Sequence, residues 1–332
     1  MALLEVDELR VTFHRRGRAD VHAVDGVSLS VEPGATVGLV GESGCGKSVT
    51  SLAVMGLLPK RGARVEGSVR FDGRDLLGLG DDEMRSLRGR DIAMVFQDPM
   101  SSLNPVVPVG VQVTEVLERH RGMKGQQAKR QAEELLTRVG IPDPRRRLRD
   151  YPHQLSGGMR QRALIAIALA CQPRLLIADE PTTALDVTIQ AQILELLREL
   201  VVDSGTALVM ITHDLGVVAG LCDSVNVMYA GRVVESADRR ELFGQPRHPY
   251  TGGLLASVPR LDSPRGEPLH PIPGSPRDTL PWTSGCAFAP RCGNEVESCR
   301  TTTPHLVADE LRAAHRLRCH NPLPVEREEA RV

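Results

Sequence analysis

The stretch that decides the fold runs Gly41-Glu42-Ser43-Gly44-Cys45-Gly46-Lys47-Ser48. It follows the apolar run Thr36–Val40, which predicts a short buried strand, and apolar residues at helical spacing follow it. The glycines allow positive φ, so backbone N–H groups can turn inward on an anion. The first turn of the following helix adds free N–H donors and the positive end of its dipole. The stretch therefore predicts a phosphate-binding loop between a strand and a helix.

Two side chains of this loop carry specific chemistry. Lys47 supplies a positive charge for the β and γ phosphates, and the Ser48 hydroxyl is a ligand for Mg²⁺. The other expected nucleotide-binding positions are Gly41, Ser43, Gly44, Cys45, Gly46 and Val49. A glycine-rich loop that ends in a chance Lys-Ser pair is the alternative. All four fixed positions of the motif are filled and its flanks fit, so the sequence favours a nucleotide site.

Composition and charge limit the classes of protein to which the chain can belong. The chain has 332 residues, 41% of them hydrophobic and 25% charged, with a net charge of −1, as expected of a water-soluble globular protein. This balance gives no reason to expect nucleic acid or an anionic membrane as a partner. The N-terminus has no signal-peptide pattern, and no apolar stretch approaches the roughly 20 residues needed to cross a bilayer. We therefore expect a cytosolic protein whose membrane role comes through partner chains.

The chain divides into segments of different texture. Residues 3–40 alternate short β-rich runs with turns, which predicts a small antiparallel sheet leading to the phosphate loop. Residues 98–158 turn helical, and βα alternation then returns, which is typical of a parallel sheet covered by helices. Beyond Glu235 the sequence becomes proline-rich. We therefore expect a nucleotide-binding domain over 1–235, with a helical subdomain at about 98–158, and an extension over 236–332.

A magnesium–nucleotide site needs a second carboxylate beside the phosphate loop. The run Leu175–Glu180 supplies it, because four apolar residues form a buried strand and Asp179 follows at its carboxyl end, where α/β sheets bind ligands. Asp179 is expected to hold Mg²⁺, and Glu180 to polarise or position the water that attacks the γ-phosphate. The alternative is a strand that merely ends in an acidic helix cap before Pro181. Pairing with the phosphate loop favours the catalytic interpretation.

Three further features extend this site. Gln97 and His213 each follow an apolar strand, so both side chains are expected in the nucleotide cleft. Ser156, Gly157 and Gly158 begin a helix and form a second anion-binding loop. One nucleotide cannot easily use two such loops of one chain. A second chain presenting this loop across an interface would sandwich two ATP molecules between two such proteins.

These motifs together resemble the ATP-binding cassette (ABC) family, and the resemblance covers nearly the whole chain. They stand in the family's order as Walker A (Gly41–Ser48), the Q-loop glutamine (Gln97), the signature (Leu155–Met159), Walker B with its glutamate (Leu175–Glu180), the D-loop (Ala184–Asp186) and the switch histidine (His213). The resemblance implies an α/β fold of the P-loop NTPase type. That fold is a mostly parallel sheet with an antiparallel β subdomain and an inserted helical subdomain, here followed by a C-terminal cysteine-rich extension.

The resemblance also implies residue roles. Glu180, His213 and Gln97 would be catalytic, and Gln97 would join Ser48 and Asp179 around Mg²⁺. The remaining implied nucleotide contacts are Phe13, which would stack on adenine, and the signature residues Ser156, Gly157 and Gly158. Phe13 could equally be a core residue of its strand. Met159 replaces the usual signature glutamine, which puts the polar contacts of that glutamine in doubt.

One branch of the family resembles the chain most closely, the ATPase subunits of oligopeptide and dipeptide importers. Similar stretches are Met55–Pro59, Phe96–Pro105, Pro181–Gln192 and His248–Thr251. The pattern looks like the D-type subunit of that branch. It implies an F-type ATPase as heterodimer partner, two membrane permeases, an extracytoplasmic peptide-binding protein, and a peripheral place on the cytoplasmic face of the cell membrane. Nucleic acid is not an expected partner.

Four cysteines cluster late in the chain, at Cys286, Cys292, Cys299 and Cys319. In a cytosolic chain disulfides are disfavoured, and four thiolates suit tetrahedral Zn²⁺ or an iron–sulfur cluster. No tight C-x2-C pair of the kind usual in zinc sites is present. The segment Cys286–Cys292 is similar to one that holds a [4Fe–4S] cluster in the peptide importers. The cluster is therefore favoured over zinc and over free thiols.

Two other functions compete with peptide import. An importer of nickel or another small solute in the same branch fits nearly as well, because other subunits choose the solute. A cassette ATPase of DNA repair fits less well. Such chains carry long coiled coils or cysteine-rich inserts between the Walker motifs, and the span from Lys47 to Asp179 has neither sustained heptads nor a cysteine-rich insert.

Overall fold

The computed structural model describes residues 1–183, 185–258, 271–275, 284–310 and 312–325. Its strands are β1 (Leu4–Phe13), β2 (Val21–Val31), β3 (Thr36–Val40), β4 (Ala63–Phe71), β5 (Arg74–Asp75), β6 (Ile92–Val95), β7 (Leu175–Asp179), β8 (Ala207–Thr212), β9 (Ser224–Tyr229), β10 (Arg232–Asp238), β11 (Val307–Asp309) and β12 (Arg312–Leu317). Its α-helices are α1 (Lys47–Val54), α2 (Asp81–Leu87), α3 (Pro99–Ser102), α4 (Val109–Arg121), α5 (Gly125–Arg138), α6 (Pro144–Arg147), α7 (Gly157–Leu169), α8 (Val187–Ser204), α9 (Leu215–Leu221), α10 (Arg239–Gly244), α11 (Pro249–Ala256) and α12 (Ser298–Thr301). Short 3₁₀ turns lie at η1 (Pro152–Gln154) and η3 (Ala289–Arg291).

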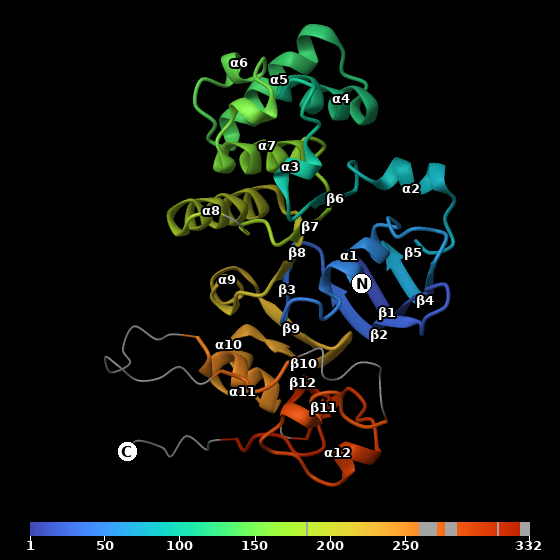
Figure 1. The fold of residues 1–332 in the computed structure, drawn as a ribbon. Coiled ribbons are helices and arrows are strands. Elements are labelled where there is room, and N and C mark those ends of the chain that lie inside the picture. Colours follow the sequence, from blue (N-terminus) through green and yellow to red (C-terminus); the bar gives the residue numbers. More distant parts are fainter. Residues whose placement is uncertain (184, 259–270, 276–283, 311, 326–332) are drawn as a thin grey trace, which may run out of the picture.

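The strands form two sheets (Figure 1). The larger sheet has the order β11-β12-β10-β9-β3-β8-β7-β6, and the smaller has the order β2-β1-β4-β5. In the larger sheet β9, β3, β8, β7 and β6 run parallel, and β10, β12 and β11 extend it by antiparallel pairing. The small sheet is antiparallel throughout. The predicted combination of a largely parallel sheet with an antiparallel β unit is confirmed.

The central strands are buried on both faces, and their residues alternate between two cores. In β7, Leu175 and Ile177 belong to the core shared with the small sheet and α1, whereas Leu176 and Ala178 belong to the core shared with the helices. This follows from the two-residue repeat of a strand, which sends successive side chains to opposite faces. The sheet therefore forms the middle layer between the two cores, and the loops at the ends of its strands are available to form a site.

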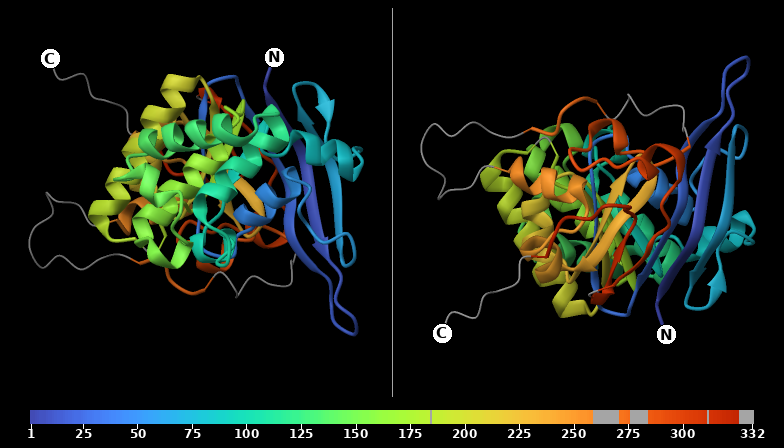
Figure 2. Two further views of the ribbon diagram at one scale, coloured as in Figure 1. Left: turned by 90° about the horizontal axis from the view of Figure 1, so that it is seen from above. Right: turned by 90° about the horizontal axis from the view of Figure 1, so that it is seen from below.

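A helical segment separates β6 from β7. It comprises α3, α4, α5, α6 and η1, and α7 leads from it back to the sheet; these helices gather at one end of the molecule in Figure 1. Figure 2 shows the small sheet on one flank of the molecule, with α2 beside it, and the green and yellow helices on the other flank. None of the helices in the described ranges combines the length and the hydropathy needed to cross a bilayer.

The large sheet continues into the part of the chain beyond Glu235. Strand β10 spans that residue, and β12 pairs with it. The Glu235 carboxylate is fully buried, and it accepts hydrogen bonds from the backbone N–H groups of Arg247 (2.6 Å) and His248 (3.0 Å). It also pairs with His315 Nε2 at 2.6 Å. One carboxylate therefore ties β10, the start of α11 and β12 together. The domain boundary at residue 235 stays a prediction.

Two local differences from the sequence reading have physical causes. The β-rich runs Leu3–Val6 and Leu9–Phe13 form one strand, because a bulge with Glu8 at φ 47° lets β1 continue across the polar residues between them. Helix α2 was not predicted, because only Met84 and Leu87 of its residues are buried and the apolar periodicity is short.

His248 gives the fold a pH dependence that can be measured. It is the N-cap of α11, where its Nδ1 accepts a hydrogen bond from the Tyr250 N–H at 3.0 Å, so the ring must be neutral at Nδ1. Burial lowers the pKa of His248 to about 4, against the opposing attraction of Glu235. The unfolded chain takes up this proton near pH 6.5 and the folded chain only near pH 4. The stabilisation is therefore complete above about pH 6.5 and is lost as the pH falls, by about 3 kcal/mol in total.

The replacement His248→Asn keeps a side-chain acceptor at the N-cap and removes the titrating group. Denaturant unfolding of the two proteins between about pH 4 and pH 7 should give a flatter dependence of the unfolding free energy on pH for the variant. Identical slopes would contradict the assignment to His248.

Candidate functional site

The phosphate loop has the backbone that its sequence predicts. Gly41, Gly44 and Gly46 have φ values of 152°, 82° and 103°. A Cβ on Gly46 would lie 2.4 Å from the Ala23 carbonyl oxygen, and one on Gly41 would lie 2.2 Å from the Met228 carbonyl oxygen. Real Cβ atoms do not approach oxygen so closely, so both positions need glycine. The loop therefore lies closely packed between β2 and β9.

Lys47 lies inside the bend of this loop. Its ammonium donates to the carbonyl oxygens of Gly41 at 2.7 Å and Glu42 at 3.0 Å, and the residue is only 4% exposed. The Cys45 sulfur lies 3.8 Å from the same ammonium. Burial raises the pKa of the Cys45 thiol, although the charge of Lys47 and hydrogen bonds lower it. A buried ammonium held this way is preorganised for an anion.

The expected Mg²⁺ ligands of α1 and β7 meet. Ser48 Oγ donates to Asp179 Oδ1 at 3.0 Å, across 131 residues of sequence. Asp179 is 5% exposed, and burial raises its pKa, with the Ser48 hydrogen bond opposing and the Glu180 charge adding to the rise. A hard divalent cation would stabilise the ionised carboxylate here. Together, the Ser48 hydroxyl and the Asp179 carboxylate supply oxygen ligands of the kind that a magnesium site needs.

Glu180 is the centre of the predicted catalytic group. Gln97 Nε2 donates to Glu180 Oε2 at 2.9 Å, Thr183 Oγ1 donates to the same oxygen at 2.8 Å, and His213 Nδ1 lies 3.3 Å from Oε1. The residue has a positive φ of 45°, and its N–H donates to the Ile211 carbonyl oxygen of β8 at 2.8 Å. This backbone turn aims the carboxylate away from the strand. The structure thus brings together Gln97, Glu180 and His213 from the ends of three adjacent strands.

The second anion loop lies apart from the first. Ser156 is the N-cap of α7 and its hydroxyl accepts the Met159 N–H at 3.3 Å. A Cβ on Gly158 would lie 2.8 Å from Ile189 Cγ2, so α8 fixes this turn closely. In Figure 1, α7 lies with the helical segment, whereas α1 lies beside β3 and the small sheet. Of the expected D-loop, Ala184 falls outside the described residues.

Phe13 ends β1, where it pairs with Val21 and Ala63. Its ring is partly buried and packs against the core below the small sheet. This position is compatible with both interpretations of the residue, because one face of a partly buried ring can be packed while the other is exposed. Its stacking role stays a prediction.

Sequence reasoning missed two residues at the phosphate loop. Arg291 forms a two-point ion pair with Glu42, and the Tyr250 hydroxyl accepts the Glu42 N–H. The sequence contained a signal for each, since Tyr250 belongs to the stretch His248–Thr251 and Arg291 to the segment Cys286–Cys292. Nothing in either pattern indicates that it reaches a loop more than 200 residues away.

The four late cysteines are all unbridged. Burial raises the pKa of Cys319 to about 12, and the nearby Cys286, Cys292 and Cys299 raise it further through charge repulsion. The side chains are therefore near enough to influence one another. Within the described ranges, no group of three or more His, Cys, Asp or Glu side chains has the geometry of a metal site.

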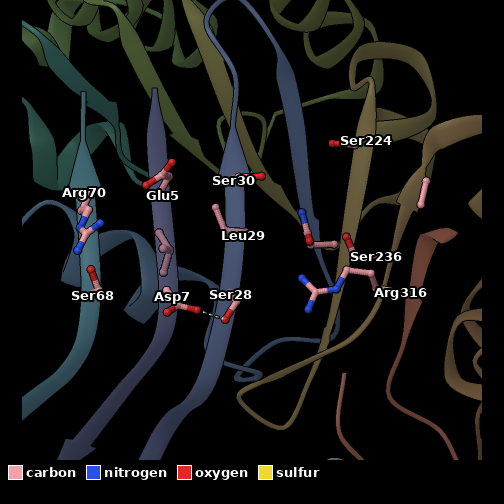
Figure 3. A pocket seen from close by; sticks show the side chains of 13 residues that line it. Glu5, Asp7, Ser28, Leu29, Ser30, Ser68, Arg70, Ser224, Ser236 and Arg316 are labelled. Carbon is pink, nitrogen blue, oxygen red and sulfur yellow. Dashed lines mark hydrogen bonds between the residues drawn. The ribbon is translucent and has the colours of Figure 1, made fainter. Parts of the chain in front are cut away.

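A polar cavity of about 580 Å³ lies between the two sheets, away from the phosphate loop (Figure 3). Its walls come from both sheets, with Asp7 and Ser28 of the small sheet joined by a hydrogen bond of 3.4 Å and Ser224 and Arg316 opposite. None of its lining residues is a predicted site residue. The predicted site therefore lies outside this cavity, at the phosphate loop and the carboxyl ends of β6, β7 and β8.

Comparison with protein-family models gives two matches. Residues 24–183 match the family described as ABC transporter, and residues 234–299 match the oligopeptide/dipeptide transporter C-terminal region. The first match contains the phosphate loop, Gln97, the signature loop and Glu180. The second contains Tyr250 and Arg291.

Individual proteins are similar over most of the chain. The oligopeptide transport ATP-binding protein OppD of Salmonella typhimurium is 53% identical over 91% of this chain and 89% of its own length. The dipeptide transport ATP-binding protein DppD of Bacillus subtilis is 54% identical over 91% of this chain and 90% of its own. Among solved structures, a dimeric ATP-binding cassette bound to ADP and phosphate has a TM-score of 0.64 and 30% identity, covering 71% of this chain and 99% of the other.

Proposed function

The chain belongs to the ABC transporter family, as an ATPase cassette, and from this we propose that it powers the import of dipeptides and oligopeptides. The observation that carries the solute class is the match of residues 234–299 to the C-terminal region of oligopeptide and dipeptide transporters. The names of the relatives from Salmonella typhimurium and Bacillus subtilis, which are transport ATP-binding proteins for oligopeptides and dipeptides, support it further.

We propose that each predicted site residue acts on ATP and Mg²⁺ as follows. Lys47 neutralises the β and γ phosphates, while Ser48, Asp179 and Gln97 hold Mg²⁺ directly or through water. Glu180 accepts a proton from the attacking water or orients it, and His213 and Gln97 hold the Glu180 carboxylate in place. The remaining proposed nucleotide contacts are Phe13, Gly41, Ser43, Gly44, Cys45, Gly46 and Val49. The hydrogen bond from Gln97 to Glu180 and the 3.3 Å approach of His213 Nδ1 to the same carboxylate support this division of roles.

The second anion loop suggests a two-chain mechanism. We propose that Ser156, Gly157 and Gly158 bind the nucleotide held by a partner cassette, so that ATP closes two cassettes and hydrolysis reopens them. The dimeric state of the similar cassette bound to ADP and phosphate supports this arrangement. The proposed partners are an F-type ATPase, two membrane permeases and an extracytoplasmic peptide-binding protein. The chain would then lie on the cytoplasmic face of the membrane, held there by the permeases.

The test of the solute class is reconstitution with the partner ATPase and the two permeases in lipid vesicles. Peptides delivered with their binding protein should raise the ATPase rate, and nickel salts should leave it unchanged. Stimulation by nickel alone would replace the peptide proposal with a metal importer. A single chain that stays monomeric with ATP and magnesium, yet hydrolyses ATP at the rate of the assembled transporter, would overturn the two-chain mechanism.

For the cysteines we propose a [4Fe–4S] cluster held by Cys286, Cys292, Cys299 and Cys319, in preference to zinc or free thiols. The donor chemistry fits, because four unbridged thiols lie in one region, where the other three raise the pKa of Cys319, and a bound metal group would stabilise them as thiolates. Such a cluster would act in this chain as a structural cross-link of the C-terminal region.

Protein purified without oxygen should be brown and should contain about four iron and four sulfide ions per chain, as that cluster type requires. Replacing Cys299 by Ser should remove the colour and most of the iron. The replacement Cys222→Ser, at a buried cysteine outside the group, should retain both. Colourless protein with zinc or with no metal would contradict the proposal.

A further inference from the structure

A buried arginine from the C-terminal region reaches the phosphate loop. Arg291 Nη1 donates to Glu42 Oε2 at 2.7 Å and Nη2 donates to Glu42 Oε1 at 3.1 Å, so the two planar groups are joined at two points. The Arg291 side chain is 3% exposed, whereas that of Glu42 is 26% exposed. The ion pair bridges 249 residues of sequence and is one of the longest-range contacts of the site.

Arg291 is itself held on several sides. Its Nε donates to the Pro273 carbonyl oxygen at 2.7 Å, and the guanidinium lies 5.7 Å from the centre of the Tyr229 ring. Tyr229 and the rings of Tyr250 and Phe288 contact one another, with centroids 4.7 to 5.3 Å apart. This aromatic cluster joins β9, α11 and the turn that bears Arg291. The guanidinium is therefore a fixed support and not a mobile surface group.

Glu42 connects Arg291 to Lys47, the lysine of the phosphate loop. Its N–H donates to the Tyr250 hydroxyl at 3.0 Å, and its carbonyl oxygen accepts from Lys47 Nζ at 3.0 Å. Glu42 is thus held at both its backbone and its side chain, and the Lys47 ammonium is hydrogen-bonded to it. Arg291 also balances the charge of a carboxylate that belongs to the predicted phosphate loop.

We propose that Arg291 is a positioning residue for nucleotide binding: it holds Glu42 in the phosphate loop and neutralises its charge, so that the loop and Lys47 accept a triphosphate. The region beyond residue 236 then contributes directly to the ATP site of its own chain. The proposal concerns ATP binding alone and does not depend on which solute is transported or on what the cysteines hold.

Replacing Arg291 by Ala should weaken binding of a non-hydrolysable ATP analogue to the full-length chain about tenfold. The physical reason is mainly that an unpaired carboxylate is left in the phosphate loop, while the lost support of the loop accounts for no more than about threefold. In the assembled transporter the KM for ATP should rise by a similar factor, while kcat should fall less than about threefold, because Glu180 and its partners are untouched.

The double replacement Glu42→Gln with Arg291→Ala separates this role from a structural one. It removes the stranded negative charge, so analogue binding should recover to within about threefold of the wild type. Arg300→Ala is the matched control, since it breaks an ion pair with Glu295 in the same region that does not touch the loop, and it should bind the analogue like the wild type.

Thermal unfolding of each variant shows whether the chain is folded at the assay temperature. Unchanged analogue binding by Arg291→Ala would overturn the proposal, and so would weak binding that the double replacement does not restore. Failure of the wild-type chain to bind the analogue would instead contradict the ATPase assignment itself.

Discussion

Replacing Glu180 by Gln should leave ATP binding close to that of the wild type and lower ATP turnover at least about 100-fold, the contribution typical of a positioned general base. The amide keeps the size of the side chain and can still accept hydrogen bonds from Gln97 and Thr183. It cannot accept a proton from water. Because the phosphate loop and the Ser48–Asp179 pair are unaffected, the loss should appear in kcat and not in the affinity for nucleotide.

The measurement is steady-state ATPase activity of the assembled transporter beside equilibrium binding of ATP. Glu195→Gln is a suitable control, because Glu195 is an exposed carboxylate that pairs with Arg198 on α8. It should hydrolyse ATP like the wild type. A Glu180→Gln variant with wild-type turnover would remove Glu180 from the mechanism, and His213 or Asp179 would then have to supply the base.

Replacing Glu235 by Ala should destabilise the fold by about 4 kcal/mol, because three buried donors lose their acceptor at once. The backbone N–H groups of Arg247 and His248 and the ring of His315 would remain desolvated without a partner. The loss should be visible as a lower denaturant midpoint. Since this carboxylate joins β10 to β12 and α11, the C-terminal region should be the first to become sensitive to proteases.

Two further variants bracket the effect. Glu235→Gln retains one acceptor oxygen and should lose roughly half as much stability, which keeps the test informative if the alanine variant fails to fold. Glu195→Ala removes a solvent-exposed carboxylate and should leave the midpoint unchanged. A Glu235→Ala protein with the wild-type midpoint would mean that water or neighbouring groups replace the carboxylate.

Local patterns were sufficient for much of the fold and site. The phosphate loop, with its glycines at positive φ, follows from fixed spacing and from the strand before it. The meeting of Gln97, Glu180 and His213 follows from a geometric rule, because each residue ends a buried strand of one parallel sheet. The residues of β7 alternate between the two cores because successive side chains of a strand point to opposite faces and both faces of this strand are buried.

The rest depends on contacts that no local pattern encodes. The support of Glu42 by Arg291 and Tyr250 joins residues more than 200 positions apart, and the exposed-looking Arg291 is surrounded by glycine, proline and cysteine in the sequence. The pairing of β12 with β10 was missed for the same reason. The run Arg312–Leu317 has no large apolar residue except Leu317, and only its pairing between β10 and β11 makes it a strand.

The ion pair between Arg291 and Glu42 has a consequence for how this protein is made. A ribosome delivers the phosphate loop early and the arginine that supports it 249 residues later. A nascent chain can therefore assemble both sheets up to β10 while its nucleotide loop still lacks this ion pair. On the proposal made above, a product terminated before Arg291 would keep the phosphate loop, Gln97, the signature loop, Glu180 and His213 yet bind ATP more weakly. On the same proposal, full nucleotide affinity comes only after Arg291 has been synthesised.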